Sequence, residues 1–241
     1  MTHVIIQPMS TFWYVATTAT VLLIAVLAYL CSRMSREKLF DLSKKLGYFI
    51  LAEIIFTNIY LWVFEHSWTL QNNLPLSLCR ASIILSALAL ITKKDSLVIW
   101  ASYLGISGGI LSILTPDLSY GISAYTIFDY YFVHGIMIFI PILLIYLLGI
   151  RLGKLSSLKA FIYGNVMFLL VFPIDFLIKA NYMYLRIRPE VHNPLLIGNW
   201  PWYIIGFEIA GIFFIVIMDV VFRVIPKYFY TSTKRGDLYK N

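Results

Sequence analysis

The chain is organised as long apolar runs separated by short polar segments. Seven of these runs approach the roughly 20 residues that an α-helix needs to cross the hydrocarbon core of a bilayer. They are continuously apolar, whereas the strands of a membrane barrel alternate over shorter segments, so helices are expected. The runs lie at about 11–31, 46–64, 75–92, 96–115, 126–149, 158–178 and 202–225. The pattern predicts an all-α integral membrane protein with seven transmembrane helices.

Composition supports this prediction. Hydrophobic residues make up 60% of the 241 residues and charged residues only 13%, against roughly 25% charged residues in soluble domains. No repeat, low-complexity tract or linker divides the chain, which predicts a single membrane domain over 1–241. The run at 11–31 has no basic segment before it and is too long for the apolar core of a signal peptide. It is therefore expected to be an uncleaved first helix.

The basic residues predict the orientation of the chain. The formal net charge is +7, but these residues are spread over short connections, which is not typical of a nucleic-acid-binding surface. Fifteen Lys and Arg lie in the connections after the first, third and fifth runs and at the C-terminal end, and three in the connection after the sixth. The positive-inside rule then predicts an outside N-terminus, a cytoplasmic basic tail at 226–241 and an extracellular cap at 179–201.

Polar side chains within apolar runs indicate where a site would lie. They are costly in a bilayer and usually face the bundle interior or a water-filled cavity. Those expected in the outer half are Asn58, Arg80, Asp129, His134, Asp175 and Glu208, while Glu53 and Asp219 lie deeper. Their distribution predicts a cavity that opens toward the outer leaflet.

Helical geometry predicts which of these groups share a face. At 100° per residue, Ser77 and Arg80 lie on one face, while Cys79 points about 100° away from Arg80. Cys79 and Ser77 are therefore not expected to line the same narrow site. The pair Gly108 and Gly109 is typical of close helix packing.

Two later segments give further predictions of facing. Tyr130, Tyr131 and His134 are expected to stack on one side of their helix, with Asp129 turned away. Eleven residues separate Glu208 from Asp219, which places both on one stripe with Gly211 and Ile215 between them.

Structural interpretations stay open for each group. A single intramembrane His134 can be a packing hydrogen-bond donor, and Arg80 can neutralise a carboxylate or extend to the interface. Cys79 can be a small buried hydrophobic residue. Trp200 and Trp202 can be interfacial anchors.

Three segments carry a resemblance to a known family. LTPDLSYG at 114–121, HG at 134–135 and NYMYL…NWPWYIIGFE within 181–208 occur in this order. Together they resemble the YwaF family of bacterial integral membrane proteins, which is distantly similar to the eukaryotic transmembrane protein 164 family. The resemblance covers roughly residues 45–215.

The resemblance implies a chemistry and a set of residues. The eukaryotic relatives resemble lipid acyltransferases that carry the acyl group on a cysteine assisted by a histidine. The histidine of HG corresponds to His134. The matching cap and last-helix positions are Asn181, Tyr182, Trp200, Trp202 and Glu208. The bacterial family usually reads LPLHLC where this chain has Ser77, and the eukaryotic cysteine stands at the position of Leu76, so Cys79 matches the bacterial cysteine only.

Two functions follow as hypotheses. One is a membrane acyltransferase or transacylase that acts on a lipid or lipid-anchored substrate with a lipid-borne acyl donor. Its nucleophile would be Cys79 or Ser77 with His134, or else a lipid hydroxyl activated by His134 as general base. The other is a non-catalytic lipid or small-solute binding protein, transporter or receptor.

The candidate residues and partners complete the prediction. The candidate catalytic residues are His134, Cys79 and Ser77, and the candidate substrate-binding residues are Arg80, Asp129, Asn181, Tyr182, Arg186, Trp202 and Glu208. No cofactor and no metal site are expected, since the histidines have no recognisable ligand spacing. Membrane lipids are the expected partners, nucleic acid is not, and the expected location is the cell membrane.

Overall fold

A computed structural model describes residues 4–118, 123–188 and 198–226. The tail prediction for 226–241, apart from its first residue, and part of the cap prediction lie outside these residues. The helical elements are α1 (Thr11–Ser32), α2 (Arg36–Val63), α3 (Leu78–Thr92), α4 (Asp95–Trp100), η1 (Ala101–Gly105), α5 (Ile106–Leu114), α6 (Ala124–Pro141), η2 (Ile142–Leu147), α7 (Ser156–Ile178), η3 (Tyr182–Tyr184), α8 (Tyr203–Asp219) and η4 (Val220–Val224). A two-stranded antiparallel ribbon joins β1 (Val4–Ile5) to β2 (Asp117–Leu118).

Within the described residues, six continuous helices are long and apolar enough to cross a membrane. They are Thr11–Ser32, Arg36–Val63, Asp95–Leu114, Ala124–Leu147, Ser156–Ile178 and Tyr203–Val224. The helical, multi-pass character predicted from the sequence is therefore confirmed. The remaining run, the third at 75–92, contains α3, which has 15 residues and is about 22 Å long at 1.5 Å per residue.

Two helices begin at positions that the apolar pattern did not indicate. The second run was expected from residue 46, but α2 begins at Arg36, and the Ser35 side chain caps it by accepting from the backbone N–H of Lys38. Hydropathy detects only the apolar part of a helix, so the basic segment up to Lys45 was wrongly assigned to a connection. At the third run, the N-cap is Ser77 and not Pro75.

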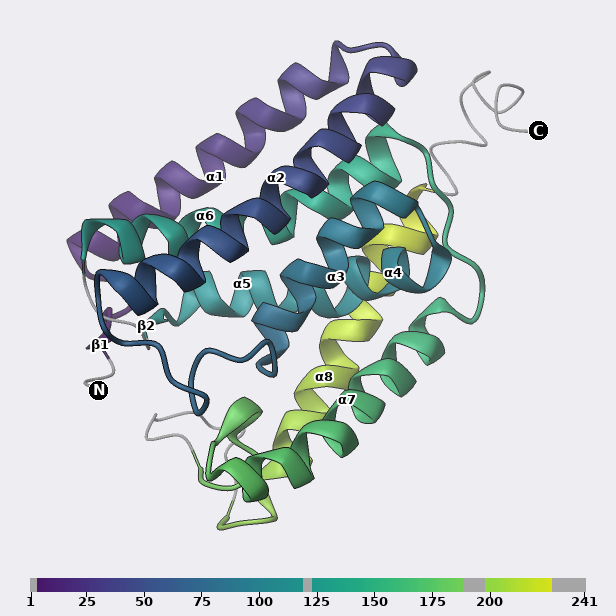
Figure 1. Cartoon of the computed structure of the whole chain (residues 1–241). Helices are drawn as coiled ribbons and strands as arrows, with labels where there is room; N and C mark the ends of the chain where they lie inside the picture. Colours follow the sequence, from purple (N-terminus) through teal and green to yellow (C-terminus); the bar gives the residue numbers. More distant parts are fainter. Residues whose placement is uncertain (1–3, 119–122, 189–197, 227–241) are drawn as a thin grey trace.

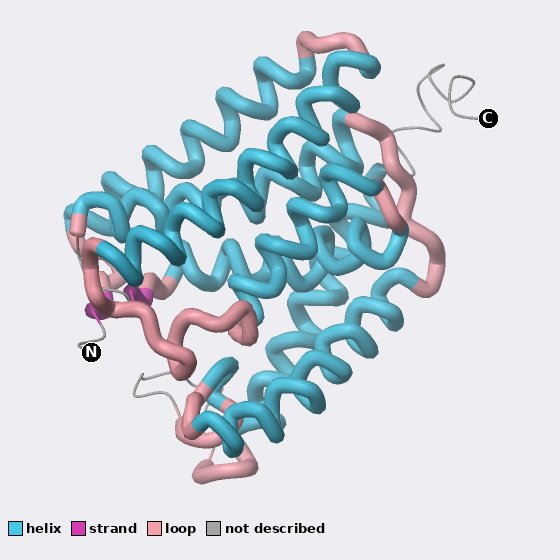
Figure 2. The backbone as a smooth tube through the Cα atoms, in the orientation of Figure 1, coloured by secondary structure: helices cyan, strands magenta, loops and turns pink. Residues whose placement is uncertain are grey.

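The two ends of the bundle carry different connections (Figures 1 and 2). The turns between α1 and α2, between α3 and α4, and between η2 and α7 lie at one end, together with the C-terminal end of α8. The opposite end holds the β1–β2 ribbon, segment 64–77 and the described part of the cap. We call the first the packed end and the second the ribbon end. Successive long helices along the chain therefore run in opposite directions.

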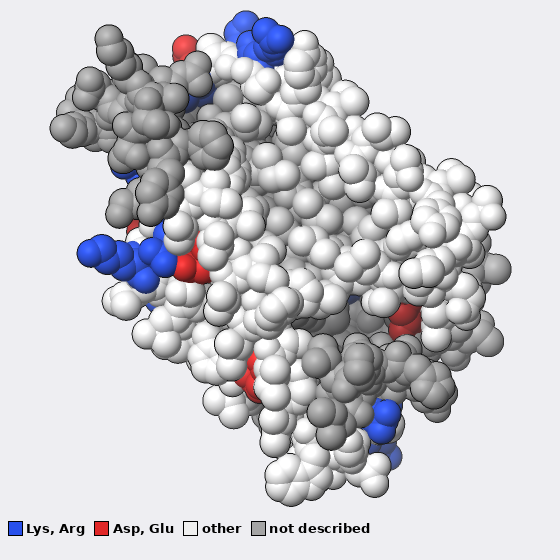
Figure 3. Space-filling view, turned by 180° about the vertical axis from the view of Figure 1, so that it is seen from behind, with Lys and Arg blue, Asp and Glu red and all other residues white. Residues whose placement is uncertain are grey.

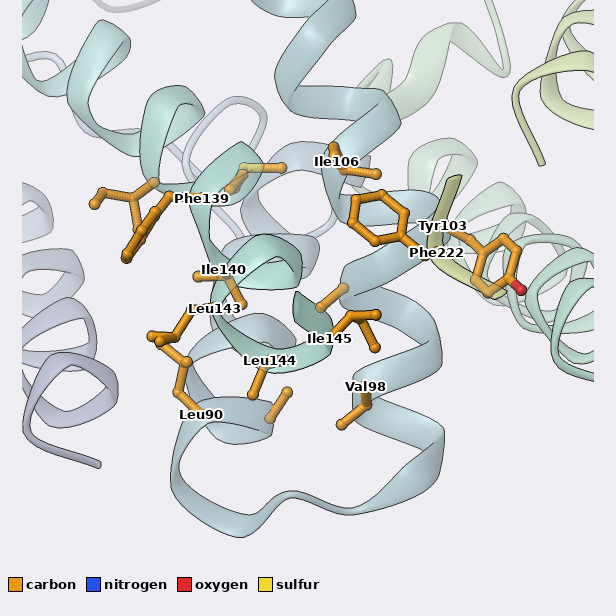
Figure 4. Close-up of a cluster of buried hydrophobic side chains, with 14 of the residues drawn as sticks. Leu90, Val98, Tyr103, Ile106, Phe139, Ile140, Leu143, Leu144, Ile145 and Phe222 are labelled. Atoms are coloured by element: carbon orange, nitrogen blue, oxygen red, sulfur yellow. The ribbon is translucent and has the colours of Figure 1, made fainter. Parts of the chain in front are cut away.

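The packed end contains the main hydrophobic core (Figure 4). Leu143, Leu144 and Ile145 of η2 are fully buried there, and Tyr103 of η1 is also fully buried. The outer faces of α1, α2, α7 and α8 instead expose many large apolar side chains, as expected for helices in contact with lipid. On the face seen in Figure 3, Lys and Arg gather near the two ends, and most of the area between them is uncharged.

Three π-helical turns meet at the packed end. The Tyr103 hydroxyl of η1 donates to Asp219 Oδ1 at 2.8 Å, directly before η4. The Tyr146 hydroxyl of η2 donates to the carbonyl of Val221 in η4. Pro141 precedes η2, and since proline lacks an N–H and crowds the preceding turn, it favours a wider turn. The side chains of Tyr103 and Tyr146 thus join η1 and η2 to the junction of α8 and η4.

Candidate functional site

A cavity of about 1040 Å³ lies between the α7–α8 pair and the helices α2, α3, α5 and α6. Near the packed end, α7 packs against α4 and η1, and α8 packs against η1 and α5. Six of the ten candidate residues line this cavity: Ser77, Cys79, Arg80, Asp129, His134 and Glu208. Candidate residues from α3, α6 and α8 therefore share one space.

Ser77 and Arg80 meet at the first turn of α3. The Ser77 Oγ accepts a hydrogen bond from the backbone N–H of Arg80 at 3.3 Å, which is an N-cap interaction. Cys79 lies in the same turn of α3. Ser77 and Cys79 were not expected to line the same narrow site, and both line this wide cavity.

Cys79 faces α5. Its Sγ lies 3.4 Å from Ser112 Oγ in a hydrogen bond that either group can donate. A Cβ on Gly108 would lie 3.4 Å from the same sulfur, which is ordinary contact. Cys79 is half-buried and not part of a disulfide.

His134 is held in one tautomer by the backbone of its own helix. Its Nδ1 lies 2.6 Å from the carbonyl oxygen of Tyr130, and because a carbonyl only accepts, Nδ1 must carry the proton. In the neutral ring, Nε2 is then the nitrogen that can accept a proton. The Tyr130 and His134 ring centroids are 4.3 Å apart, and the Tyr130 hydroxyl donates to the Ser112 carbonyl at 2.8 Å.

A carboxyl pair lies on the α2–α6 side of the cavity. The Thr57 hydroxyl lies 2.7 Å from Glu53 Oε1 and 3.3 Å from Asp129 Oδ1. It also contacts the Tyr125 hydroxyl at 2.5 Å. Arg80 lines the same cavity as Asp129 and His134.

The predicted facing of α6 is partly wrong. Tyr130 and His134 line the cavity, but so does Asp129, which was expected to turn away. Tyr131 instead packs against Phe12 of α1, with ring centroids 6.5 Å apart. The cavity covers a wider arc of α6 than the narrow site that helical facing assumed.

Glu208 contacts the facing helix α7. The Asn165 amide donates to Glu208 Oε2 at 3.3 Å, and Asn165 also lines the cavity. Of the stripe predicted on α8, Glu208, Gly211 and Ile215 line the cavity. Asp219 lies beyond it, where it accepts from Tyr103 and pairs with Arg223.

The candidate cap residues Asn181, Tyr182 and Arg186 do not line the cavity. Asn181 Oδ1 accepts from the backbone N–H of Arg186 at 3.1 Å. The Tyr182 hydroxyl donates to the carbonyl of Leu70 at 2.8 Å and accepts from the N–H of Leu74 at 2.9 Å. These bonds fold the cap and connect it to segment 64–77.

Arg186 and Asp175 anchor the cap to α7. The Arg186 guanidinium donates to the carbonyl oxygens of Asp175 and Ala180, and the Tyr182 N–H donates to Asp175 Oδ1 at 3.0 Å. Asp175 is fully buried and does not line the cavity, so its predicted place in the outer-half cavity is wrong.

Trp202 is 65% exposed and lies away from the cavity, and Trp200 is 48% exposed. The exposure of Trp202 is typical of an interfacial anchor. Tyr203 is fully buried, and its hydroxyl donates to the carbonyl of Tyr184 at 2.6 Å.

The lining residues that were not identified from the sequence include Thr57, Ser112, Asn165 and Tyr184. Asn165 had a usable signal, since it is an amide within an apolar run. Thr57 and Ser112 had none, because hydroxyls in membrane helices commonly bond their own backbone. In the part of the chain that the structure describes, no group of three or more His, Cys, Asp or Glu side chains is placed to hold a metal ion.

Comparison with known proteins gives one match. The model of the TMEM164 family matches residues 7–219, which include all the elements that line the cavity except the β1 strand. No curated protein and no solved structure matches the chain.

Proposed function

Since the chain belongs to the TMEM164 family, we propose that it is a membrane acyltransferase or transacylase acting on a lipid or lipid-anchored substrate, and that it belongs to the bacterial YwaF branch. The observation that carries the proposal is the cavity, in which a histidine of fixed tautomer, a cysteine at a helix N-terminus and an arginine from the same turn share one space. An apolar cavity with few polar groups suits a lipid substrate.

In the covalent form of the reaction, Cys79 is the nucleophile. The thiol gives its proton to His134 Nε2, the sulfur attacks the ester carbonyl of the donor lipid to form a thioester, and the donor's oxygen leaves with that proton. The hydroxyl of the acceptor lipid then gives its proton to His134 and attacks the thioester, and the departing sulfur takes this proton, which restores the thiol. This form requires a rearrangement, because the thiol hydrogen-bonds Ser112 in the described structure.

In the direct form, His134 is the general base. Its Nε2 takes the proton of the acceptor hydroxyl, whose oxygen attacks the donor ester, and the same proton goes to the departing oxygen of the donor. The carbonyl of Tyr130 stabilises the required tautomer by accepting from Nδ1. Ser77 is the weaker nucleophile candidate, since its oxygen caps α3.

Arg80 would stabilise negative charge in either form. Its guanidinium lies in the cavity wall and can bind the lipid phosphate or the oxygen that becomes anionic during acyl transfer. Asp129 and Glu53 on the neighbouring helices would hold the guanidinium in place.

The proposed topology is a single domain with seven crossings in the cell membrane, with the N-terminus outside. α3 would be the seventh span, because it connects the ribbon end to the packed end (Figure 1), with segment 73–77 completing the crossing. The cavity then opens to the outer leaflet, which favours a lipid-borne acyl donor.

A non-catalytic lipid-binding or transport function is the second candidate. One observation favours it: the hydroxyl of Ser77 and the thiol of Cys79 both make structural hydrogen bonds. The same cavity would then bind its ligand without reaction.

Mass spectrometry of membrane lipids and lipoproteins tests the first proposal. The strains to compare are wild type, a null mutant, His134→Ala and, as a matched control on the outer face of α6, Phe128→Ala, whose side chain is 63% exposed. One acylated species should disappear in the null and in His134→Ala but persist in Phe128→Ala. An unchanged profile in the null strain excludes the acyltransferase. If the species disappears, Cys79→Ala distinguishes the two forms, because only the covalent form loses all product.

A further inference from the structure

The cavity continues past the polar groups as an apolar arm. Its walls come from η1, α7 and α8 and include Leu104, Ala160, Gly164, Gly211, Phe214 and Ile215. Asn165 and Glu208 stand at its entrance, where their side chains are hydrogen-bonded to each other. Tyr103 closes it toward the packed end.

The floor of the arm is fixed. Tyr103 is fully buried, and its hydroxyl donates to Asp219. Asp219 is in turn held by the guanidinium of Arg223. Because both Tyr103 and Asp219 belong to the junction of π-helical turns, the arm ends at the packed end.

The width of the arm depends on two glycines. A Cβ on Gly211 would have no atom within 4 Å, so this position borders open space. A Cβ on Gly164 would lie 3.6 Å from Leu104 Cδ2, which is ordinary contact. Neither glycine is needed for helix packing, in contrast to Gly109, whose Cβ would lie 2.9 Å from the carbonyl oxygen of His134.

The depth of the arm suits the distal part of one lipid chain. Glu208 at the entrance and Ile215, the last α8 residue that lines the cavity, are separated by seven residues of one helix, which is about 10 Å. The hydrocarbon core of a bilayer is about 30 Å thick, so the chains of one leaflet fill about 15 Å. Water is a poor occupant, since the walls of the arm offer few hydrogen-bond partners.

We propose that the apolar arm binds one acyl chain of a membrane lipid, with the chain's terminal methyl against Tyr103 and its ester near Arg80 and His134, and that Gly211 and Gly164 set which chains fit. The position of the ester rests on the proposed function, but the binding of the chain does not. Gly211 and Gly164 are thus specificity-determining residues.

Photo-crosslinking tests the occupant without any need for activity. The full-length protein is placed in lipid nanodiscs with phosphatidylglycerol, phosphatidylethanolamine or phosphatidylcholine, each carrying a diazirine beside the terminal methyl of one acyl chain. Labelled peptides are then mapped by mass spectrometry. The expected labels are Tyr103 or Ile215. Labels from all three lipids restricted to outward residues such as Ile209 and Ile212 overturn the inference.

Gly211→Leu narrows the arm, and Ile212→Phe adds bulk on the exposed face of the same helix as a matched control. Most of the label at Tyr103 and Ile215 should be lost in Gly211→Leu and kept in Ile212→Phe. Equal labelling in the two variants contradicts the role of Gly211. Circular dichroism and thermal unfolding of each variant confirm that it is folded.

The products separate this inference from the proposed function. If acyl transfer occurs, Gly211→Leu should shift the transferred acyl groups toward shorter chains. Labelling in the arm without any acyl transfer by the wild type supports the inference and rejects the acyltransferase. Acyl transfer with no label in the arm and an unchanged chain-length profile supports the acyltransferase and rejects the inference.

Discussion

The packed end and the cavity are built from the same helices but differ in what separates those helices. At the packed end, Leu143 and Ile145 fill the space between the helices and are fully buried. Toward the ribbon end, α7 and α8 are spaced from the other helices, and the space holds polar side chains on its walls. The cavity is therefore kept open by contacts that lie outside it. The packed end fixes α7 and α8 at one side, and the cap bonds of Tyr182 fix them at the other.

The largest expected effect is on the acyl-transfer rate, in a comparison of Arg80 in the cavity with Lys93 at the packed end. Arg80→Met should lower the acyl-transfer rate by about 10²–10³-fold, the usual loss when a group that stabilises an oxyanion is removed. Lys93→Met is the matched control, because Lys93 donates to Ser43 and to the Leu90 carbonyl away from the cavity. Rates are measured on purified protein with labelled lipid. An Arg80→Met rate equal to that of Lys93→Met contradicts the role of Arg80.

The second effect compares two glycines. Gly109→Ala should destabilise the protein by about 1–3 kcal/mol, because the new methyl group meets the backbone of α6. Gly211→Ala should be neutral or stabilise by about 0.5–1 kcal/mol, since alanine favours the helix and meets no atom. Unfolding in detergent by heat or denaturant gives the difference. Equal stabilities would mean that the helices are as loosely packed at Gly109 as at Gly211.

A third comparison concerns the two tyrosines that fix α7 and α8. Tyr182→Phe removes the hydrogen bonds to Leu70 and Leu74, which should cost about 1 kcal/mol locally and speed exchange of the Leu74 amide several-fold. Tyr103→Phe should leave that amide unchanged, because its bond to Asp219 lies at the other end. Hydrogen exchange with mass spectrometry measures both. Faster exchange at Leu74 in Tyr103→Phe would show that the two ends are coupled.

The smallest effect is a pH dependence at the packed end. Burial, with a smaller contribution from the nearby charge of Lys44, lowers the pKa of Lys93 to about 8 from its usual value of 10.5. Between these two values the unfolded chain binds more protons than the folded chain, so stability should rise with pH through this window. The melting temperature of the wild type should therefore rise slightly from about pH 8 to pH 10 relative to Lys93→Met. Parallel curves for the two proteins would contradict the lowered pKa of Lys93.

The sequence was sufficient to predict the membrane helices but not to predict which residues line the cavity. Continuous apolar runs predict membrane helices because the bilayer requires them, and six were found. The charged start of α2 was missed because a helix can extend past the apolar region. The assignment of Asp129 failed because helical facing needs a narrow site. Nothing local indicates that Asn181 and Tyr182 fold the cap, since their partners come from positions set by tertiary structure.

The α7–α8 pair is held at the packed end and, through the cap, at the ribbon end, while the cavity lies behind its middle. A bilayer exerts lateral pressure on the exposed apolar faces of these helices, and the Asn165–Glu208 contact is a bond between the two helices rather than a support against the other wall. We therefore expect the width of the cavity to respond to the membrane itself. The tension and thickness of the bilayer would act on this protein as physical inputs, in addition to any chemical ligand.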